Sequence, residues 1–518
     1  MRKLPINVLF AVFLLITSLL CYTSLTNGHS WGDDFSSYIM QAKSIVEGKP
    51  LEFIEANRLT IEQSSYPIGP IAYPWGYPTL LAPIYAVFGF DIFALKSVSV
   101  VCFILFILVL WFTFRKYHSG YWRILFLCLF AFNPYLIQHT DGVYSDLPFL
   151  LFSTISVMLM GTVIVERKRI FSRVLDHIIL GFVIAATYFV RTNGILLLIT
   201  LGITQFTILI SNVGFQKCKY DNQTTHKNFS FLQIKHNTLG NLCINLLPYA
   251  SFIILLLSWN SLFPNGGSYH VSQLSNVSFR SICNMINYNI NESAEFFGIF
   301  PNKYLIYGAT IPLALTGIIW RWRSDLHIII YITLTILLFS IWPYRQGLRF
   351  LFPILPFYYS FMMTSLEKFH RSGSGIEQSI YKIICTLPII VIVSYFSYAV
   401  VKNAYANVSR NRSISNGPYV ETSKEMFTYI SNNISPASTV IFWKPRVMRM
   451  MTGRKSLMVD KLEELTRGDY LCIYMKGDVY DQISIKDLEN LIAKQYIELV
   501  FKNKDFKIYR LSKSYKNA

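Results

Sequence analysis

Two adjacent carboxylates follow the first long apolar segment of the chain. Asp33 and Asp34 come directly after Trp31 and Gly32, a few residues beyond an apolar run that ends near Leu25. A carboxylate just outside the hydrocarbon region stays ionised and still reaches a lipid head group, which a general base acting on a lipid-borne substrate requires. Aspartate is also a favoured helix N-cap, and a helix is expected to begin here. A cap explains one aspartate, so the pair predicts a catalytic site.

Two more carboxylates lie in a short turn between later apolar segments, on the side of the membrane predicted for Asp33. Asp146 either caps the helix that follows, with Pro148 in its first turn, or faces the same outer cavity as Asp33. Both interpretations stay open. Asp141 lies in the same turn, and we favour Asp146 over it as a site residue.

Three arginines, namely Arg191, Arg345 and Arg349, occupy turns predicted to lie outside. Outer cations are informative because Lys and Arg concentrate in cytoplasmic loops. Each could snorkel from the end of a span or pair with a loop carboxylate. A guanidinium can also grip a phosphate with two hydrogen bonds and stabilise the charge that grows on it as it leaves. We therefore predict that these arginines bind substrate.

The composition is that of a polytopic membrane protein. Of 518 residues, 53% are hydrophobic and only 15% are charged, and the mean hydropathy is +0.39. The net charge of +18 fits cytoplasmic loops held against anionic lipid, so nucleic acid is not an expected partner. The eight cysteines form no C-x-x-C pair, and neither a metal site nor a disulfide framework is indicated.

About 11 membrane spans are predicted from apolar runs long enough to cross a bilayer. The N-terminal run follows Arg2 and Lys3 and lacks a cleavage site, so it is predicted to be an uncleaved signal anchor with a cytoplasmic N-terminus. The odd number of spans places the C-terminus outside. The predicted spans are 8–25, 93–114, 122–137, 147–165, 178–190, 195–210, 242–259, 304–320, 327–342, 350–366 and 383–401.

The fold class predicted is therefore an α-helical membrane domain, residues 1–401, followed by a small extracytoplasmic α/β domain, residues 402–518. Outer loops are expected at 26–73 and 260–303, and a cytoplasmic loop at 211–240. Residues 35–46 are predicted to form an amphipathic helix on the membrane surface, ending near Gly48. The apolar run 79–88 is too short to span. In the C-terminal domain, strands are predicted at 439–443, 470–474 and 497–501, and helices at 421–432 and 484–495.

Several short motifs follow one another over the first 360 or so residues. They are Asp33-Asp34, Tyr73-Pro74-Trp75-Gly76-Tyr77-Pro78 with Phe88-Gly89, Ser145-Asp146-Leu147-Pro148, Arg191-Thr192-Asn193-Gly194, and Arg349-Phe350-Leu351-Phe352-Pro353 with Pro356. In this order the chain resembles the polyprenyl-phosphate-dependent glycosyltransferases of the GT-C type, in the branch with protein O-mannosyltransferases and bacterial aminoarabinose transferases.

The resemblance implies an inverting hexosyl or pentosyl transfer from a polyprenyl-phosphate sugar to an acceptor hydroxyl, without metal or cofactor, on the outer face of the plasma (inner) membrane. Asp33 would be the general base and Asp34 would support it. Asp146 would orient the substrate, and Arg349, with Arg345 or Arg191, would stabilise the departing phosphate. The partners implied are the lipid-linked donor, membrane lipids and an acceptor that is a glycan, a lipid or a protein.

One departure from the family pattern affects the phosphate site. Aminoarabinose transferases carry a lysine before the proline of the segment after the first loop, whereas this chain has Tyr73-Pro74. The stretches 443–446 and 452–454 resemble outer domains appended to some bacterial members, and no role is predicted for them. Two alternative functions are a transporter or flippase of lipid-linked sugars, expected to carry polar groups near mid-membrane, and a polysaccharide polymerase or ligase.

Overall fold

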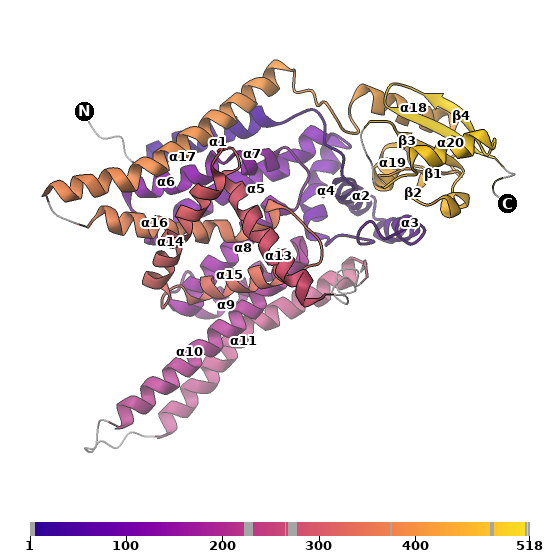
Figure 1. The fold of residues 1–518 in the computed structure, drawn as a ribbon. Helices are drawn as coiled ribbons and strands as arrows, with labels where there is room; N and C mark the ends of the chain where they lie inside the picture. Colours follow the sequence, from indigo (N-terminus) through magenta and orange to yellow (C-terminus); the bar gives the residue numbers. More distant parts are fainter. Residues whose placement is uncertain are drawn as a thin grey trace.

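The chain folds into a large helical body and a small C-terminal domain that packs against one part of it (Figure 1). The structure is a computed structural model that describes residues 6–221, 231–264, 266–267, 277–372, 375–476, 481–512 and 515. Within these ranges, only the backbone is described for residues 211–221, 231–239, 241–242 and 375–379.

The helical body is that of a multi-pass membrane protein. Among the described residues, eight helices are long and apolar enough to span a bilayer, and a ninth span is possible if two helices bent by 55° are counted as one. The two remaining predicted spans, 327–342 and 350–366, correspond to helices of 16 residues. The eight are α1 (Ile6–Ser24), α5 (Ile92–Thr113), α8 (Asp146–Met160, continued to Val165), α9 (Arg173–Val190), α10 (Ile195–Asp221), α11 (Phe231–Leu262), α14 (Lys303–Arg321) and α17 (Gly375–Ser409); the bent pair is α6 (Gly120–Ala131) and α7 (Pro134–Thr140); the short ones are α15 (Leu326–Ile341) and α16 (Leu355–His370).

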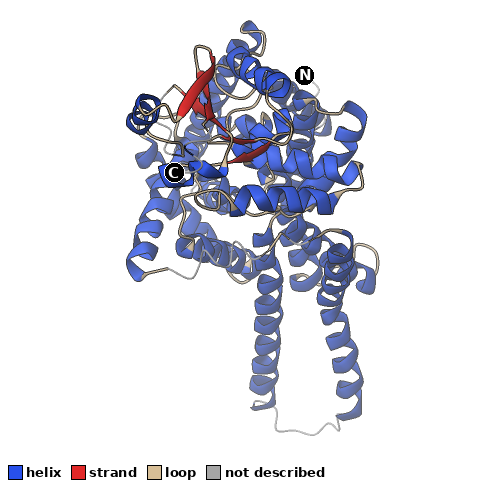
Figure 2. Ribbon diagram, turned by 90° about the vertical axis from the view of Figure 1, so that its right-hand side faces the viewer, coloured by secondary structure: helices blue, strands red, loops and turns tan. Residues whose placement is uncertain are grey.

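Helices α10 and α11 run well beyond the predicted span boundaries at 210 and 242 and project from the body as a pair (Figures 1 and 2). The prediction of a loop over 211–240 is therefore wrong for most of its length, and residues 222–230 lie outside the described residues. Hydropathy marks where apolar character ends. The Gln and Lys residues that follow favour helix, so the helices continue in polar sequence.

Three short helices lie between the helical body and the C-terminal domain: α2 (Asp34–Val46), α3 (Pro50–Glu62) and α4 (Gly76–Phe88). Helix α2 ends as predicted, with Gly48 at φ +70. It packs between α4 and residues 445–452 of the C-terminal domain, and eight of its 13 residues are buried. The position of this helix on the membrane surface stays a prediction. Buried Gln41 exchanges hydrogen bonds with the backbone of Tyr73, at 2.8 and 3.1 Å.

The C-terminal domain is α/β, as predicted. Its five-stranded sheet has the order β2-β1-β3-β5-β4, with β1 parallel to β2 and β3, and β5 antiparallel to β3 and β4. The domain boundary predicted at residue 401 falls inside α17. The prediction missed β2, α19 and β5. The elements are α18 (Glu421–Asn433), β1 (Thr439–Ile441), α19 (Pro445–Thr452), β2 (Lys455–Leu457), β3 (Tyr470–Tyr474), α20 (Ile485–Ala493), β4 (Ile497–Lys502) and β5 (Phe506–Leu511).

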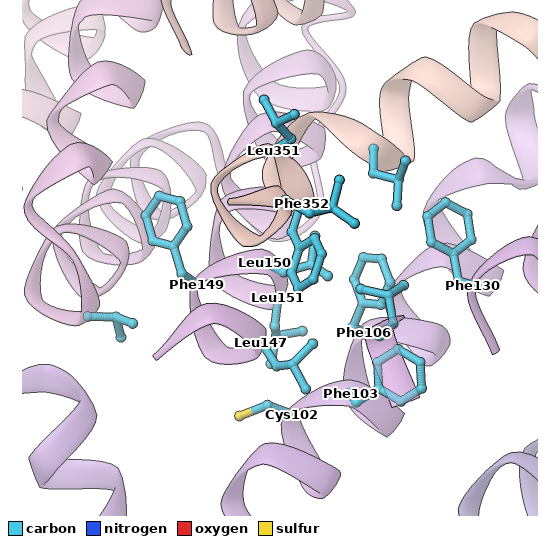
Figure 3. Packing of buried hydrophobic residues seen from close by; sticks show 14 of the residues in the cluster. Cys102, Phe103, Phe106, Phe130, Leu147, Phe149, Leu150, Leu151, Leu351 and Phe352 are labelled. Atoms are coloured by element: carbon cyan, nitrogen blue, oxygen red, sulfur yellow. The ribbon is translucent and has the colours of Figure 1, made fainter. Parts of the chain in front are cut away.

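An apolar core fixes the 3-10 helix η6 (Leu348–Ile354) over α8. Leu351 and Phe352 of η6 are buried together with leucines of α8 and phenylalanines of α5 (Figure 3). Burial of side chains of this size contributes about 2 kcal/mol each. The core therefore holds the beginning of η6, where Arg349 lies, beside the beginning of α8, where Asp146 lies.

Candidate active site

The acid pair opens α2, and its side chains do not cap the helix. Asp33 occupies the N-cap position, but its side chain accepts no capping hydrogen bond. Ser36 Oγ instead donates to the backbone carbonyl of Asp33, at 2.7 Å. Asp34 is the first helical residue, and its Oδ1 accepts a hydrogen bond from the Tyr73 hydroxyl, at 2.5 Å. The cap interpretation therefore accounts for neither carboxylate.

The two carboxylates face different partners. Asp34 Oδ2 lies 3.8 Å from Nη2 of Arg349. Asp33 faces the C-terminal domain, where its Oδ1 is buried and has no hydrogen-bond partner among the described residues. Burial raises the pKa of Asp33 to about 6, against the opposing influence of Arg446 and Lys444.

Asp146 lies between two arginines. Its Oδ1 accepts a hydrogen bond from Nη1 of Arg191 at 2.5 Å, and its Oδ2 is 4.0 Å from Nη1 of Arg349. The guanidinium of Arg191 also stacks over the ring of Phe350, 4.4 Å from its centroid. Residues from α2, η6, α8 and the end of α9 thus form a row of alternating charge: Asp34, Arg349, Asp146, Arg191.

A close backbone contact places the end of α9 in this row. A Cβ added to Gly76, the first residue of α4, would lie 2.5 Å from the carbonyl carbon and oxygen of Phe189. Only glycine permits this approach. Because Arg191 follows Phe189 by two residues, the Gly76 contact sets the position of Arg191 relative to α4 and the adjoining Tyr73 segment.

The loop before the acid pair is fixed by a buried ion pair. Nζ of Lys96, fully buried in α5, lies 2.6 Å from Asp141 Oδ1 and donates to the backbone carbonyl of Thr26 at 2.9 Å. His29 accepts from the backbone N–H of Val143 at 3.2 Å. Asp141 therefore has a structural role, because its ion pair with Lys96 holds the loop before α2 in place.

Arg345 takes a different position from the other two arginines. Its exposed guanidinium lies 5.1 Å from the centroid of the Tyr288 ring. The Tyr288 hydroxyl accepts from the backbone N–H of Gly347, at 3.2 Å. The contacts found for Arg345 in the described part of the chain thus support the turn before η6, and the structure does not bring it into the charged row.

A cavity of about 650 Å³ adjoins the charged row, and Arg349 lines it. This volume lies within the usual range for ligand pockets, about 300–1,000 Å³. The remaining wall is mostly polar and comes from the region around α7 and from the end of α17 with the residues that follow. It includes His139, Tyr144, Asn403, Asn407 and Arg410.

Within the described residues, no group of three or more His, Cys, Asp or Glu side chains is arranged to hold a metal ion. The metal-independent mechanism stays a prediction.

Sequence reasoning missed three residues of this region: Tyr73, Lys96 and Arg446. Lys96 carried a usable signal, since a lone lysine in a membrane span marks a partner or a function. Tyr73 and Arg446 lie in the motifs at 73–78 and 443–446, and the sequence predicted no role for either residue. Their contacts join segments separated by more than 300 residues, and local pattern does not report such contacts.

No model of a protein family matches the chain, and no curated protein sequence matches it. Solved structures do. ArnT from Cupriavidus metallidurans aligns with a TM-score of 0.57 and 11% identity, over 98% of this chain and 99% of that one, and a second ArnT structure with bound undecaprenyl phosphate aligns equally well. The archaeal oligosaccharyltransferase AglB from Archaeoglobus fulgidus aligns with a TM-score of 0.53 and 12% identity, over 90% of this chain and 69% of that one.

Both proteins are GT-C glycosyltransferases. The alignment with ArnT runs through the helical body and the C-terminal domain together, since it covers nearly the whole of both chains. The chain therefore has the GT-C fold.

Proposed function

We propose that this protein is a membrane glycosyltransferase that moves a sugar from a polyprenyl-phosphate donor to an acceptor hydroxyl. The observation that carries the proposal is the position of Arg349, which lies between Asp34 and Asp146 and lines the cavity. A guanidinium that lines the cavity and a carboxylate beside that guanidinium supply the two groups that the reaction needs, an anion binder and a base. The structures of ArnT with undecaprenyl phosphate and of AglB with dolichol phosphate support the class of donor.

In this reaction a carboxylate takes the proton of the acceptor hydroxyl while the acceptor oxygen attacks the anomeric carbon. The bond from that carbon to the phosphate oxygen breaks, and polyprenyl phosphate leaves with one more negative charge. Attack opposite the leaving group inverts the anomeric configuration. Guanidinium groups stabilise the charge on the leaving phosphate because they donate two hydrogen bonds in a fixed plane.

The contacts favour Asp34 as the base, which reverses the roles assigned from the sequence. Asp34 has a side chain that is 36% exposed, and it faces Arg349. Asp33 instead faces Arg446 and Lys444 of the C-terminal domain, with its Oδ1 buried. A base must lie within hydrogen-bond reach of the proton it removes. Asp33 then has a supporting role.

Arg349 is the arginine best placed to bind phosphate, since its side chain is 30% exposed. The carboxylate of Asp146 is only 3% exposed and contacts both Arg349 and Arg191. Asp146 therefore serves the reaction by holding the two arginines. Arg191, with one amine already bonded to Asp146, contributes mainly through its charge.

The reaction is proposed to take place outside the cytoplasm, at the plasma (inner) membrane. The N-terminus is cytoplasmic and the C-terminal domain extracytoplasmic in this arrangement. A reporter enzyme that is active only outside the cytoplasm, fused after Ala518, is expected to be active. Activity only from a cytoplasmic reporter at the same point would contradict the orientation.

The function is tested with protein in lipid nanodiscs and a panel of radiolabelled polyprenyl-phosphate sugars, by following release of polyprenyl phosphate and labelling of the acceptor. Asp34→Asn is expected to lower turnover about a hundredfold or more, the scale of a lost general base, and Asp33→Asn less. Asp91→Asn is the matched control, because Asp91 caps α5 through two backbone N–H groups and Asn caps as well. Wild-type turnover by both acid-pair variants, or movement of lipid across the bilayer without phosphate release, would refute the proposal.

A further inference from the structure

The C-terminal domain places a buried arginine against the segment that contacts the acid pair. Arg446, on α19, is fully buried. Its Nη2 donates to the backbone carbonyl of Pro70 at 2.5 Å, and its Nη1 lies 3.5 Å from the hydroxyl oxygen of Tyr73. A Cβ on Gly69, which has φ +155, would lie 3.0 Å from Nη1. The backbone of this segment thus closes around the guanidinium.

A chain of hydrogen bonds leads from this guanidinium to the acid pair. Nη1 of Arg446 donates to Tyr73 Oη, and Tyr73 Oη donates to Asp34 Oδ1. Asp33 lies close enough to Arg446 for each to influence the charge of the other. The charged and titratable groups found to interact with the acid pair come from five places: Arg446 and Lys444 from the domain, Tyr73 from the segment before α4, Tyr38 from α2 itself, Tyr144 from the turn before α8, and Arg349 from η6.

Two further contacts attach the domain on either side of Arg446. The indole of Trp31 is surrounded by rings from the domain, with centroids 5.5 to 6.4 Å away, and its Nε1 donates to Asn416 Oδ1 at 2.9 Å. After α3, the backbone N–H of Ser65 donates to the carbonyl of Met458 at 2.9 Å. The rings around Trp31 are those of Phe427, Phe442, Trp443, Tyr474 and Phe506.

We propose that the C-terminal domain is part of the catalytic unit, and that Arg446 is a positioning residue that holds Tyr73 against Asp34 and balances the charge of the acid pair. The inference rests on the proposed function, because it assigns the acid pair to catalysis.

The physical need for such a cation follows from the site. Two neighbouring carboxylates in a partly buried place repel each other, and burial also favours their neutral forms. Residues 66–78 contain no Lys or Arg of their own. Arg446 supplies the missing charge from the far end of the chain, and it stays ionised in a buried place because its guanidinium rarely loses its proton. An ionised Asp34 can then accept a proton from the acceptor.

The test is the pH profile of turnover for Arg446→Gln and Arg446→Lys, with Arg449→Gln as the matched control on the same helix. Without the guanidinium charge, the ionised form of the acid pair loses a favourable partner, so the acidic limb of the Arg446→Gln profile is expected to move to higher pH by about one unit or more. The loss of turnover in Arg446→Gln relative to wild type is therefore expected to be largest at low pH and to shrink as the pH rises. Arg446→Lys keeps the charge and is expected to keep the limb near its wild-type position.

Arg449 lies over Phe53, with its guanidinium carbon 5.7 Å from the ring centroid, and its Nη1 is buried without a hydrogen-bond partner. Arg449→Gln is therefore expected to show the wild-type profile. Arg446→Gln turnover that is unchanged, or lowered by the same factor at every pH, would overturn the inference, since a merely structural role lowers the amount of active protein at all pH values alike.

Tyr73→Phe provides a second variant should Arg446→Gln fail to fold. It keeps the ring that packs under Arg446 and removes the hydroxyl that donates to Asp34, so its acidic limb is also expected to move to higher pH. A wild-type profile would overturn the inference. The two proposals fail differently: wild-type turnover by Asp34→Asn refutes the base, whereas an inactive Asp34→Asn with a wild-type Arg446→Gln profile refutes only the role of Arg446.

Discussion

Arg349 lies 3.8 Å from Asp34, measured between Nη2 and Oδ2, and its Nη1 is 4.0 Å from Asp146 Oδ2. Both distances are longer than a hydrogen bond, whereas Arg191 bonds Asp146 at 2.5 Å. The two carboxylates therefore hold Arg349 in place electrostatically and leave its N–H groups available to an anion in the cavity. Arg191 already uses one of its amine groups in the hydrogen bond to Asp146.

The first prediction concerns this difference among the arginines. Arg349→Gln is expected to lower kcat/KM about a hundredfold, the scale of losing one transition-state donor. Arg349→Lys is expected to recover part of the loss, because an ammonium is a point charge without the planar fork. Arg345→Gln is expected to cost less than about tenfold, since Arg345 faces Tyr288. Steady-state kinetics with the preferred donor checks the order, and a greater loss for Arg345→Gln would contradict it.

A second prediction follows from the raised pKa of Asp33. Its folded-state pKa of about 6 exceeds the ordinary value of 3.8, so the stability contributed by its protonated form is full below about pH 4 and is lost as the pH rises through 6. Asn carries no charge at any pH. The melting temperature of Asp33→Asn minus that of wild type is therefore expected to increase between pH 4 and 6 and then level off. A difference that stays constant over this interval would show that Asp33 is not buried as described.

A third prediction tests the contact between α4 and α9. Gly76→Ala places a methyl group 2.5 Å from the backbone of Phe189, which must shift, and overpacking of this kind costs about 1–3 kcal/mol. Turnover should fall as well, because Arg191 moves with Phe189. The control is Gly308→Ala in α14, where an added Cβ meets nothing within 4 Å, and where alanine favours helix. Equal melting temperatures for the two variants would contradict the close approach.

A fourth prediction concerns the attachment of the C-terminal domain through Trp31. Trp31→Ala removes the indole from its surrounding rings and deletes the hydrogen bond to Asn416. The domain is expected to separate more often from the helical body, which exposes the segment after α17 to protease and lowers turnover. Limited proteolysis measures the cleavage rate between α17 and α18, and Trp31→Phe is expected to fall between wild type and Trp31→Ala. A cleavage rate equal to wild type in Trp31→Ala would contradict the attachment.

Apolar runs predicted the membrane helices well. A segment that spans the bilayer satisfies its backbone hydrogen bonds within the helix and exposes its side chains to lipid, so those side chains must be mostly apolar. The C-terminal strands at β1, β3 and β4 followed from the same reasoning about apolar runs. Strand β5 was missed although it pairs with two neighbours, because Lys507 and Arg510 interrupt the apolar run over Phe506–Leu511. Helix α19 was missed because its first residues read as a motif and its length is only eight residues.

The candidate site was predicted in part. The sequence pointed to Asp33, Asp34, Asp146, Arg191, Arg345 and Arg349. The structure brings four of them into one charged row, whereas Asp33 faces the C-terminal domain and Arg345 faces Tyr288. Which acid faces Arg349 depends on the direction of single side chains at the start of α2, and periodicity does not determine that. The partner of Tyr73 depends on how a separate domain docks, which no local pattern contains.

The closure of residues 69–73 around Arg446 also sets an order of events during synthesis. The ribosome completes the acid pair, the cavity wall and Arg349 before it reaches residue 446. A nascent chain halted between residues 416 and 446 contains the acid pair, Arg349 and the residues that line the cavity, and still lacks the cation behind Tyr73. Full turnover at low pH is therefore expected only when the last-made part of the protein has docked onto one of its first-made loops.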